Sequence, residues 1–176
     1  MRVRWVLGAA AAAGASAQVA YATQYLTLEQ AQHAAFPTVD EFRDAGTVDA
    51  AIAAKLGAPA GWSPRVFDAR AGGKRLGWFI ADQALGKSEM IGYALALDTH
   101  GAVTWLEILD YRESHGGEVR LAPWRKQFLG KTAADPVELN RDIKNISGAT
   151  LSCRHVTEGV QRLLKYWAAA LAEKAE

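Results

Sequence analysis

The C-terminal part of the chain carries a long run of apolar side chains at helical spacing, and this run constrains the fold more than any other feature. Its apolar positions are Leu151, Val156, Val160, Leu163, Leu164, Trp167 and Leu171, with Cys153 on the same side. A helix with one apolar face must bury that face against another layer. The sequence therefore predicts a helix from about residue 150 to residue 172 that packs on a sheet.

Three strand candidates precede this helix and supply the sheet. They cover residues 75–81, 90–97 and 103–109, and short turns at 85–88 and 98–101 separate them. Strands joined by such short turns form an antiparallel meander. Shorter helices are expected around it, over residues 27–36, 48–56 and 124–128. The pattern predicts an α+β fold, in which an antiparallel sheet is flanked by helices in a single domain.

The first 22 residues have the pattern of a secretory signal. Arg2 and Arg4 precede an apolar, Ala-rich run over residues 5–15, and small residues with signal-peptidase-like spacing follow at 15–17 and 20–22. We expect export with cleavage after Ala22, or an uncleaved N-terminal anchor. Either outcome predicts a periplasmic or other extracytoplasmic location, with residues 23–176 forming the folded domain.

Composition narrows the function classes. The chain has 176 residues, 50% of them hydrophobic, which is enough for one globular core. The formal net charge of +1 gives no basic field for nucleic acid. Cys153 is the single cysteine, so no intramolecular disulfide can form, and we expect a buried core thiol. His155 and Glu158 lie three residues apart without a third ligand, which favours an exposed helix pair over a metal site.

The tetrapeptide Ser147-Gly148-Ala149-Thr150 stands where a loop turns into the last helix. Small residues at a helix N-terminus leave room for an anion, and the unpaired N–H groups of the first turn favour a phosphate. An ordinary capped helix start is the alternative interpretation. Taken alone, the tetrapeptide leaves both interpretations open.

The segment 113–118 after the third strand candidate is the second candidate site. Glu113, Gly116 and Gly117 combine a carboxylate with backbone that can approach a ligand closely, although a polar hairpin loop has the same composition. The sequences Gly86-Lys87-Ser88 and Gly130-Lys131-Thr132 look like pieces of a nucleotide-binding loop. Both lack the earlier glycine of that motif, so neither is interpreted as one.

Residues 142–152, with the sequence Asp-Ile-Lys-Asn-Ile-Ser-Gly-Ala-Thr-Leu-Ser, resemble the flavinylation motif of the FMN-binding domain. That domain occurs in the C subunit of sodium-pumping NADH:quinone reductase and in the G subunit of Rnf complexes. Residues 113–118, Trp124 and residues 127–131 resemble the segment that these proteins carry before the motif. One position differs, because Lys144 stands where the family usually has an acidic residue.

The resemblance implies a cofactor and a site. FMN would be joined through its phosphate to Thr150 as a phosphoester, installed by an exported flavin transferase that uses FAD and a divalent metal. The implied cofactor-binding residues are Thr150, Ser147, Gly148, Ala149, Leu151, Glu113, Gly116 and Gly117. Trp105 or Trp124 is expected to flank the flavin ring.

The function implied is electron transfer between redox partner proteins, which include membrane-bound ones as candidates. No catalytic acid or base is evident, and electron transfer needs none. Two alternatives stay open. One is a flavin-dependent reductase of a small acceptor such as a quinone. The other is a sensory or assembly module that binds FMN or another ligand without a covalent bond.

Overall fold

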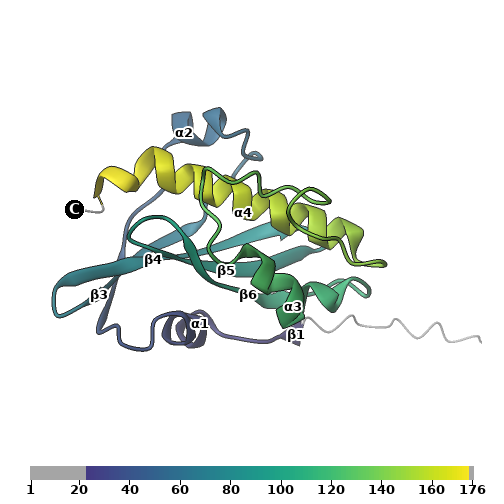
Figure 1. Cartoon of the computed structure of the whole chain (residues 1–176), viewed down its shortest axis with the longest axis horizontal. Coiled ribbons are helices and arrows are strands. Elements are labelled where there is room, and N and C mark those ends of the chain that lie inside the picture. The colour runs from purple at the N-terminus through teal and green to yellow at the C-terminus, as the bar shows by residue number, and fades with distance from the viewer. Residues whose placement is uncertain (1–22, 175–176) are drawn as a thin grey trace, which may run out of the picture.

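The computed structural model describes residues 23–174, so the predicted signal at residues 1–22 lies outside the described part of the chain (Figure 1). A six-stranded antiparallel sheet has the strand order β1-β6-β5-β4-β3-β2. The strands are β1 (Thr23–Gln24), β2 (Glu41–Asp44), β3 (Arg65–Ala71), β4 (Lys74–Leu85), β5 (Met90–Asp98) and β6 (Val103–Tyr111). The predicted antiparallel meander and the α+β class are confirmed.

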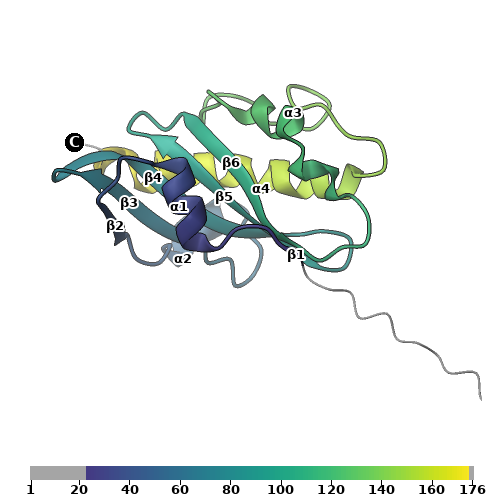
Figure 2. The ribbon, with the colours of Figure 1, turned by 90° about the horizontal axis from the view of Figure 1, so that it is seen from below.

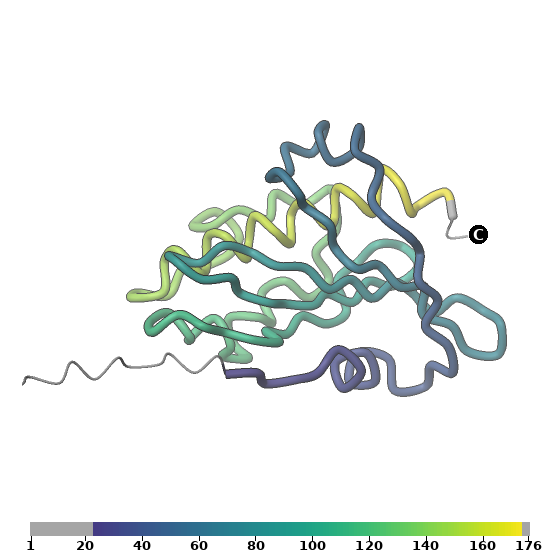
Figure 3. The backbone as a smooth tube through the Cα atoms, turned by 180° about the vertical axis from the view of Figure 1, so that it is seen from behind, coloured from purple at the N-terminus to yellow at the C-terminus, as the bar shows by residue number. Residues whose placement is uncertain are grey.

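Helices cover both faces of this sheet. They are α1 (Leu28–Ala35), α2 (Ala50–Lys55), α3 (Ala122–Arg125) and α4 (Thr150–Ala170), with 3-10 turns η1 (Gly117–Arg120), η2 (Lys126–Phe128) and η3 (Ala172–Lys174). Helix α4 crosses one face, and α1 lies on the other (Figures 1 and 2). Between β2 and β3 the chain passes the sheet edge, which places α2 beside α4 (Figure 3).

The core has two parts, one on each face. The larger part lies between α4 and the sheet and contains Tyr93, Val156, Val160, Leu163 and Leu164, all at most 1% exposed. The smaller part lies under α1 and contains Ala31, Phe36, Phe67, Phe79 and Ala96. Cys153 is fully buried in the larger part, as expected, and burial raises the pKa of its thiol.

The short helices begin where the sequence supplies a cap. Thr27 Oγ1 accepts the Gln30 N–H at 3.2 Å and Gln30 Oε1 accepts the Thr27 N–H at 2.9 Å, and together they form a capping box at the start of α1. Asp49 Oδ1 accepts the N–H groups of Ala51 and Ile52 and starts α2. None of the helices between residues 23 and 174 is long and apolar enough to span a membrane.

Strands β1, β2 and β3 were not predicted from the sequence, and the side chain of Leu151 lies elsewhere than expected. Strands β1 and β2 are short edge strands, and β3 carries Asp68 and Arg70 among its apolar residues, which hides its pattern. Leu151 was expected in the buried stripe of α4 but is 42% exposed. Leu151 lines a cavity instead of packing on the sheet.

Strand β1 pairs with the end of β6, close to the segment that follows β6. Thr23 pairs with Tyr111 and Gln24 with Asp110, at the last residues of β6. The described chain therefore enters the fold beside the segment that leads to Glu113. Arg120 extends over the Tyr25 ring at 3.7 Å and fixes this entry to η1.

Candidate functional site

Thr150 is the first residue of α4, and its side chain is exposed. Gly148 makes the preceding turn with φ +88°, a conformation that favours glycine. Ala149 then takes the N-cap position, where its methyl group cannot accept a hydrogen bond from the helix. No side chain caps the N-terminus of α4 in the described structure. The donors of its first turn and the positive end of its dipole therefore face solvent.

A cavity of about 300 Å³ opens beside Thr150. Three segments far apart in the sequence line it: the β4–β5 turn, the segment after β6 and the start of α4. Its lining residues are Lys87, Ser88, Glu113, Ser114, His115, Gly116, Gly148, Ala149, Thr150, Leu151 and Ser152. Six of the eight residues predicted for the site thus lie together, while Ser147 and Gly117 do not line the cavity.

Glu113 holds one wall of the cavity in place. Its Oε1 accepts the Ser88 N–H at 2.5 Å and the Glu89 N–H at 2.9 Å. Burial by itself raises the pKa of Glu113, but these backbone donors outweigh it and hold the pKa below its ordinary value. The carboxylate is therefore ionised at neutral pH, and it positions the β4–β5 turn that carries Lys87.

Gly116 allows the start of α4 to approach β6. The Tyr111 hydroxyl donates to the His115 carbonyl at 2.5 Å and lies 2.9 Å from Ser152 Oγ, which donates to it. Gly116 has φ +90°, and a Cβ there would lie 2.7 Å from the Tyr111 hydroxyl and 2.8 Å from Ser152 Oγ. Only glycine fits between these two groups, so the predicted importance of Gly116 has a packing reason.

Two side chains of the α3–η2 segment fix the backbone of the motif. Trp124 Nε1 donates to the Lys144 carbonyl at 2.9 Å, and Gln127 Oε1 accepts the Lys144 N–H at 2.8 Å. The Lys144 side chain itself is exposed. Asn145 Nδ2 donates to Thr150 Oγ1 at 3.0 Å, which orients the hydroxyl. Asn145, which follows Lys144 in the sequence, thus contacts Oγ1 of Thr150.

Trp124 borders an open apolar hollow on the other side of the motif, together with Leu121, Pro123 and Ile146. Trp105 lies in the core part under α1, on the sheet face opposite α4. Of the two alternatives for an aromatic residue beside the flavin ring, Trp124 is adjacent to the motif and Trp105 is not. Side chains alternate between the two faces along β6, and Trp105 points to the α1 face, away from the motif.

Asp142 stabilises the loop before the motif. Its oxygens accept from Lys131 Nζ at 2.9 Å, from the Glu138 N–H at 2.8 Å and from the Val137 N–H at 3.2 Å. Burial raises the pKa of Asp142, but these donors together lower it below its ordinary value. The nearest acid to the position occupied by Lys144 therefore has a structural role in this chain.

Lys87 and Ser88 are site residues that the sequence reasoning did not identify. The sequence Gly86-Lys87-Ser88 is not a nucleotide-binding loop, and no local signal connects it to Thr150. The antiparallel pairing of β4 with β5 and the crossing of α4 bring Lys87 to the cavity. A Cβ at Gly86 would lie 2.6 Å from Glu113 Oε1, so this glycine makes room for the carboxylate that holds the turn.

These residues fit a cofactor that carries a phosphate. The N-terminus of α4 and the side chain of Lys87 lie at one cavity, and both favour the negative charge of a phosphate. The exposed hydroxyl of Thr150 lines the same cavity. The polar cavity and the neighbouring apolar hollow suit a molecule with a polar chain and a flat ring.

Comparison with known proteins supports FMN as that cofactor. The family model of the FMN-binding domain matches residues 86–165. The matched residues include all three segments that line the cavity. No curated protein matched the chain. Residues 86–165 are therefore similar to the FMN-binding domain family, and this match supports FMN as the cofactor.

Proposed function

We propose that FMN is attached covalently to Thr150 and that the protein transfers electrons between redox partners outside the cytoplasm. The observation that carries this proposal is the exposed Thr150 hydroxyl at an uncapped helix N-terminus, beside a cavity that contains Lys87. When bound, FMN supplies one- and two-electron redox chemistry, while the protein supplies attachment, orientation and electrostatics.

The attachment reaction has a defined balance. A bond forms between Thr150 Oγ1 and the FMN phosphorus of FAD, the bond between the two phosphates breaks, and AMP leaves. The hydroxyl proton passes to a base of the flavin transferase. Thr150 is accessible for this reaction because its side chain is exposed and Gly148 and Ala149 leave its surroundings open.

The residues around Thr150 have separate tasks in this proposal. Asn145 donates to Oγ1 and orients it. The phosphodiester keeps one negative charge, which Lys87 and the N-terminus of α4 stabilise. Glu113 fixes the turn that bears Lys87, and Trp124 with Gln127 fixes the motif backbone. None of these residues needs to exchange a proton during electron transfer.

The first test measures covalent flavin on the denatured protein, after coexpression with an active flavin transferase. The wild-type protein should gain the mass of one FMN less one water and fluoresce in a denaturing gel. Thr150→Ala should lose both signals, while Ser147→Ala, which removes a neighbouring exposed hydroxyl, should keep them. Denaturation-resistant flavin on Thr150→Ala would refute the assignment, provided that both variants unfold like the wild type.

Export and partners are tested separately. N-terminal sequencing of the protein from its own cell envelope should find the mature chain beginning after Ala22, or the intact N-terminus if the segment is an anchor. Reoxidation of the reduced protein should be fast with protein acceptors and show no saturation with small quinones. Saturable turnover with a small quinone would favour the reductase, and unmodified mass beside an active transferase would favour a non-covalent module.

A further inference from the structure

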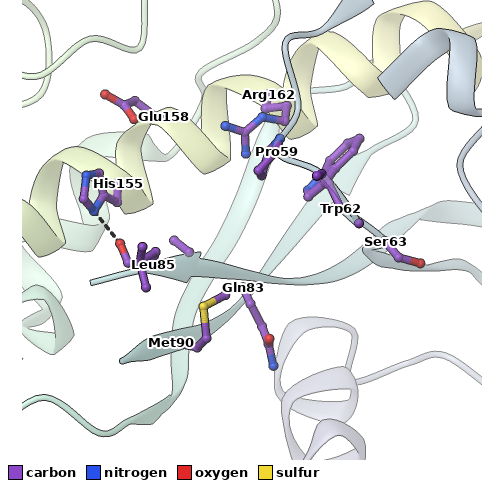
Figure 4. A pocket seen from close by; sticks show the side chains of 12 residues that line it. Pro59, Trp62, Ser63, Gln83, Leu85, Met90, His155, Glu158 and Arg162 are labelled. Atoms are coloured by element: carbon purple, nitrogen blue, oxygen red, sulfur yellow. Dashed lines mark hydrogen bonds between the residues drawn. The ribbon is translucent and has the colours of Figure 1, made fainter. Parts of the chain in front are cut away.

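A second pocket, of about 460 Å³, lies between α4 and the ends of β4 and β5, and the loop before β3 closes it (Figure 4). Figure 4 shows Arg162 and Trp62 at one end and His155 with Leu85 at the other. It has no lining residue in common with the cavity at Thr150. The FMN site does not account for this pocket.

Its aromatic wall is rigid. Trp62 Nε1 donates to Asp82 Oδ2 at 3.0 Å, and the buried Tyr93 hydroxyl donates to the same oxygen at 2.8 Å. Asp82 is 8% exposed, so two donors compensate its charge behind the indole. Tyr166 packs edge-on against Trp62 at 5.9 Å between ring centroids. The indole is therefore held in a fixed orientation at the pocket.

Arg162 supplies the charge of the pocket. Its side chain is half-buried and lies 5.8 Å from the centroid of the Trp62 ring. Among the residues that the structure describes, no ion pair involves Arg162, and Glu158, one turn earlier on α4, is the carboxylate that shares the pocket lining. A half-buried guanidinium outside any ion pair keeps donors free, and a planar anionic group matches their geometry best.

The remaining walls combine apolar side chains with the polar residues Ser63, Gln83, His155 and Glu158. Leu85 and Met90 face each other across β4 and β5 and are 54% and 40% exposed. His155 Nδ1 is hydrogen-bonded to the Leu85 carbonyl, which fixes the imidazole at the far end of the pocket. Glu158 is exposed at the rim. The interior thus combines apolar surface, a fixed aromatic ring and the guanidinium of Arg162, with the Glu158 carboxylate at the rim.

We propose that this pocket binds a small aromatic anion, separately from FMN. The flat ring of the ligand lies against Trp62, Leu85 and Met90, and its carboxylate or sulfonate oxygens pair with Arg162. The volume is in the range of small-molecule sites. A single aromatic or fused bicyclic ring with one acidic substituent matches this combination of surfaces.

The test uses 2-naphthoate as the probe and flavin-free protein, prepared without the transferase, so its outcome is independent of Thr150. The chain contains two methionines, Met1 and Met90, and a 13C-methyl spectrum therefore reports on the pocket directly. Saturable binding of 2-naphthoate should shift the Met90 methyl resonance. Arg162→Met, which keeps the aliphatic stem, should weaken 2-naphthoate binding about tenfold or more.

Two matched comparisons make the test decisive. Neutral 2-naphthol should bind the wild type and Arg162→Met alike, because it has no anion for the guanidinium. Lys87→Met, which changes the cavity at Thr150, should leave 2-naphthoate binding unchanged. An unmoved Met90 resonance, equal 2-naphthoate affinity in Arg162→Met, or weakened binding in Lys87→Met would each overturn the proposal.

Discussion

Gly116 offers a sharp test of how the cofactor site is packed. Its φ of +90° is unfavourable for any side chain, and a Cβ would lie 2.7 Å from the Tyr111 hydroxyl and 2.8 Å from Ser152 Oγ. Gly148 has nearly the same φ, +88°, but nothing lies within 4 Å of its Cβ position. Gly117 has no such φ, and its nearest contact would be the Tyr111 ring at 3.8 Å. Alanine variants of these three glycines therefore distinguish the cost of backbone strain from the cost of steric overlap.

The magnitudes follow from these distances. A left-handed conformation at a non-glycine residue costs about 1–3 kcal/mol, which is the whole effect expected for Gly148→Ala. Gly116→Ala has the same strain and adds overpacking of about 1–3 kcal/mol. Separation of Tyr111 from Ser152 costs up to about 1.5 kcal/mol more. Gly117→Ala should be within about 1 kcal/mol of the wild type or slightly more stable.

Urea unfolding of flavin-free protein measures these differences as free energies of unfolding. We expect Gly116→Ala to be the least stable of the three variants, by at least about 1 kcal/mol relative to Gly148→Ala. Adding Ser152→Ala to Gly116→Ala should recover part of the loss, because it removes one of the two overlapping atoms. Equal stability of Gly116→Ala and Gly148→Ala would refute the account of close approach between β6 and α4.

Two further predictions concern the scaffold. Gly159→Ala should lower the free energy of unfolding by about 1–3 kcal/mol, because its Cβ would overlap the Tyr93 hydroxyl. In a Tyr93→Phe background the loss of stability should be smaller, and an equal loss in a double-mutant cycle would contradict the contact. Burial raises the pKa of Asp68, but Arg75 and Arg70, at 2.7–2.8 Å, outweigh it and hold that pKa below its ordinary value. The stabilisation of the fold by the Asp68 ion pairs is therefore present at neutral pH and is lost as the pH falls below about 4. Asp68→Asn should be less stable than the wild type at pH 7 and should lose less stability on acidification. Parallel profiles of stability against pH for the two proteins would exclude this role of Asp68.

Local sequence patterns determined the elements that have strong signals of their own. The capping box of Thr27 and Gln30 and the helical repeat after Thr150 depend on residues a few positions apart, and both appear in the structure. The three strand candidates do as well, since short turns leave an antiparallel pairing as the simplest solution. Edge strand β2 has no such signal, because its sequence Glu-Phe-Arg-Asp is mostly polar.

The candidate site was only partly accessible from the sequence. Thr150 and Gly148 could be identified because a helix start with small residues is a local pattern. Glu113 and Gly116 could be identified as a carboxylate beside flexible backbone, and the family resemblance favoured the same segment. Their roles differ from a simple list of ligand contacts. Glu113 binds backbone N–H groups of the β4–β5 turn, and Gly116 is required by the contact between Tyr111 and Ser152.

The sequence by itself determined the long amphipathic helix, the central meander and the position of Thr150 at a helix start, because each depends on neighbours along the chain. Only the tertiary structure decided that Lys87 joins Thr150, that Trp105 faces away from it, and that Arg162 lies beside Trp62. Strand pairing and the crossing of α4 over the sheet set these three relations, and both act between residues separated by 45 positions or more along the chain. Local periodicity contains no information about such pairs.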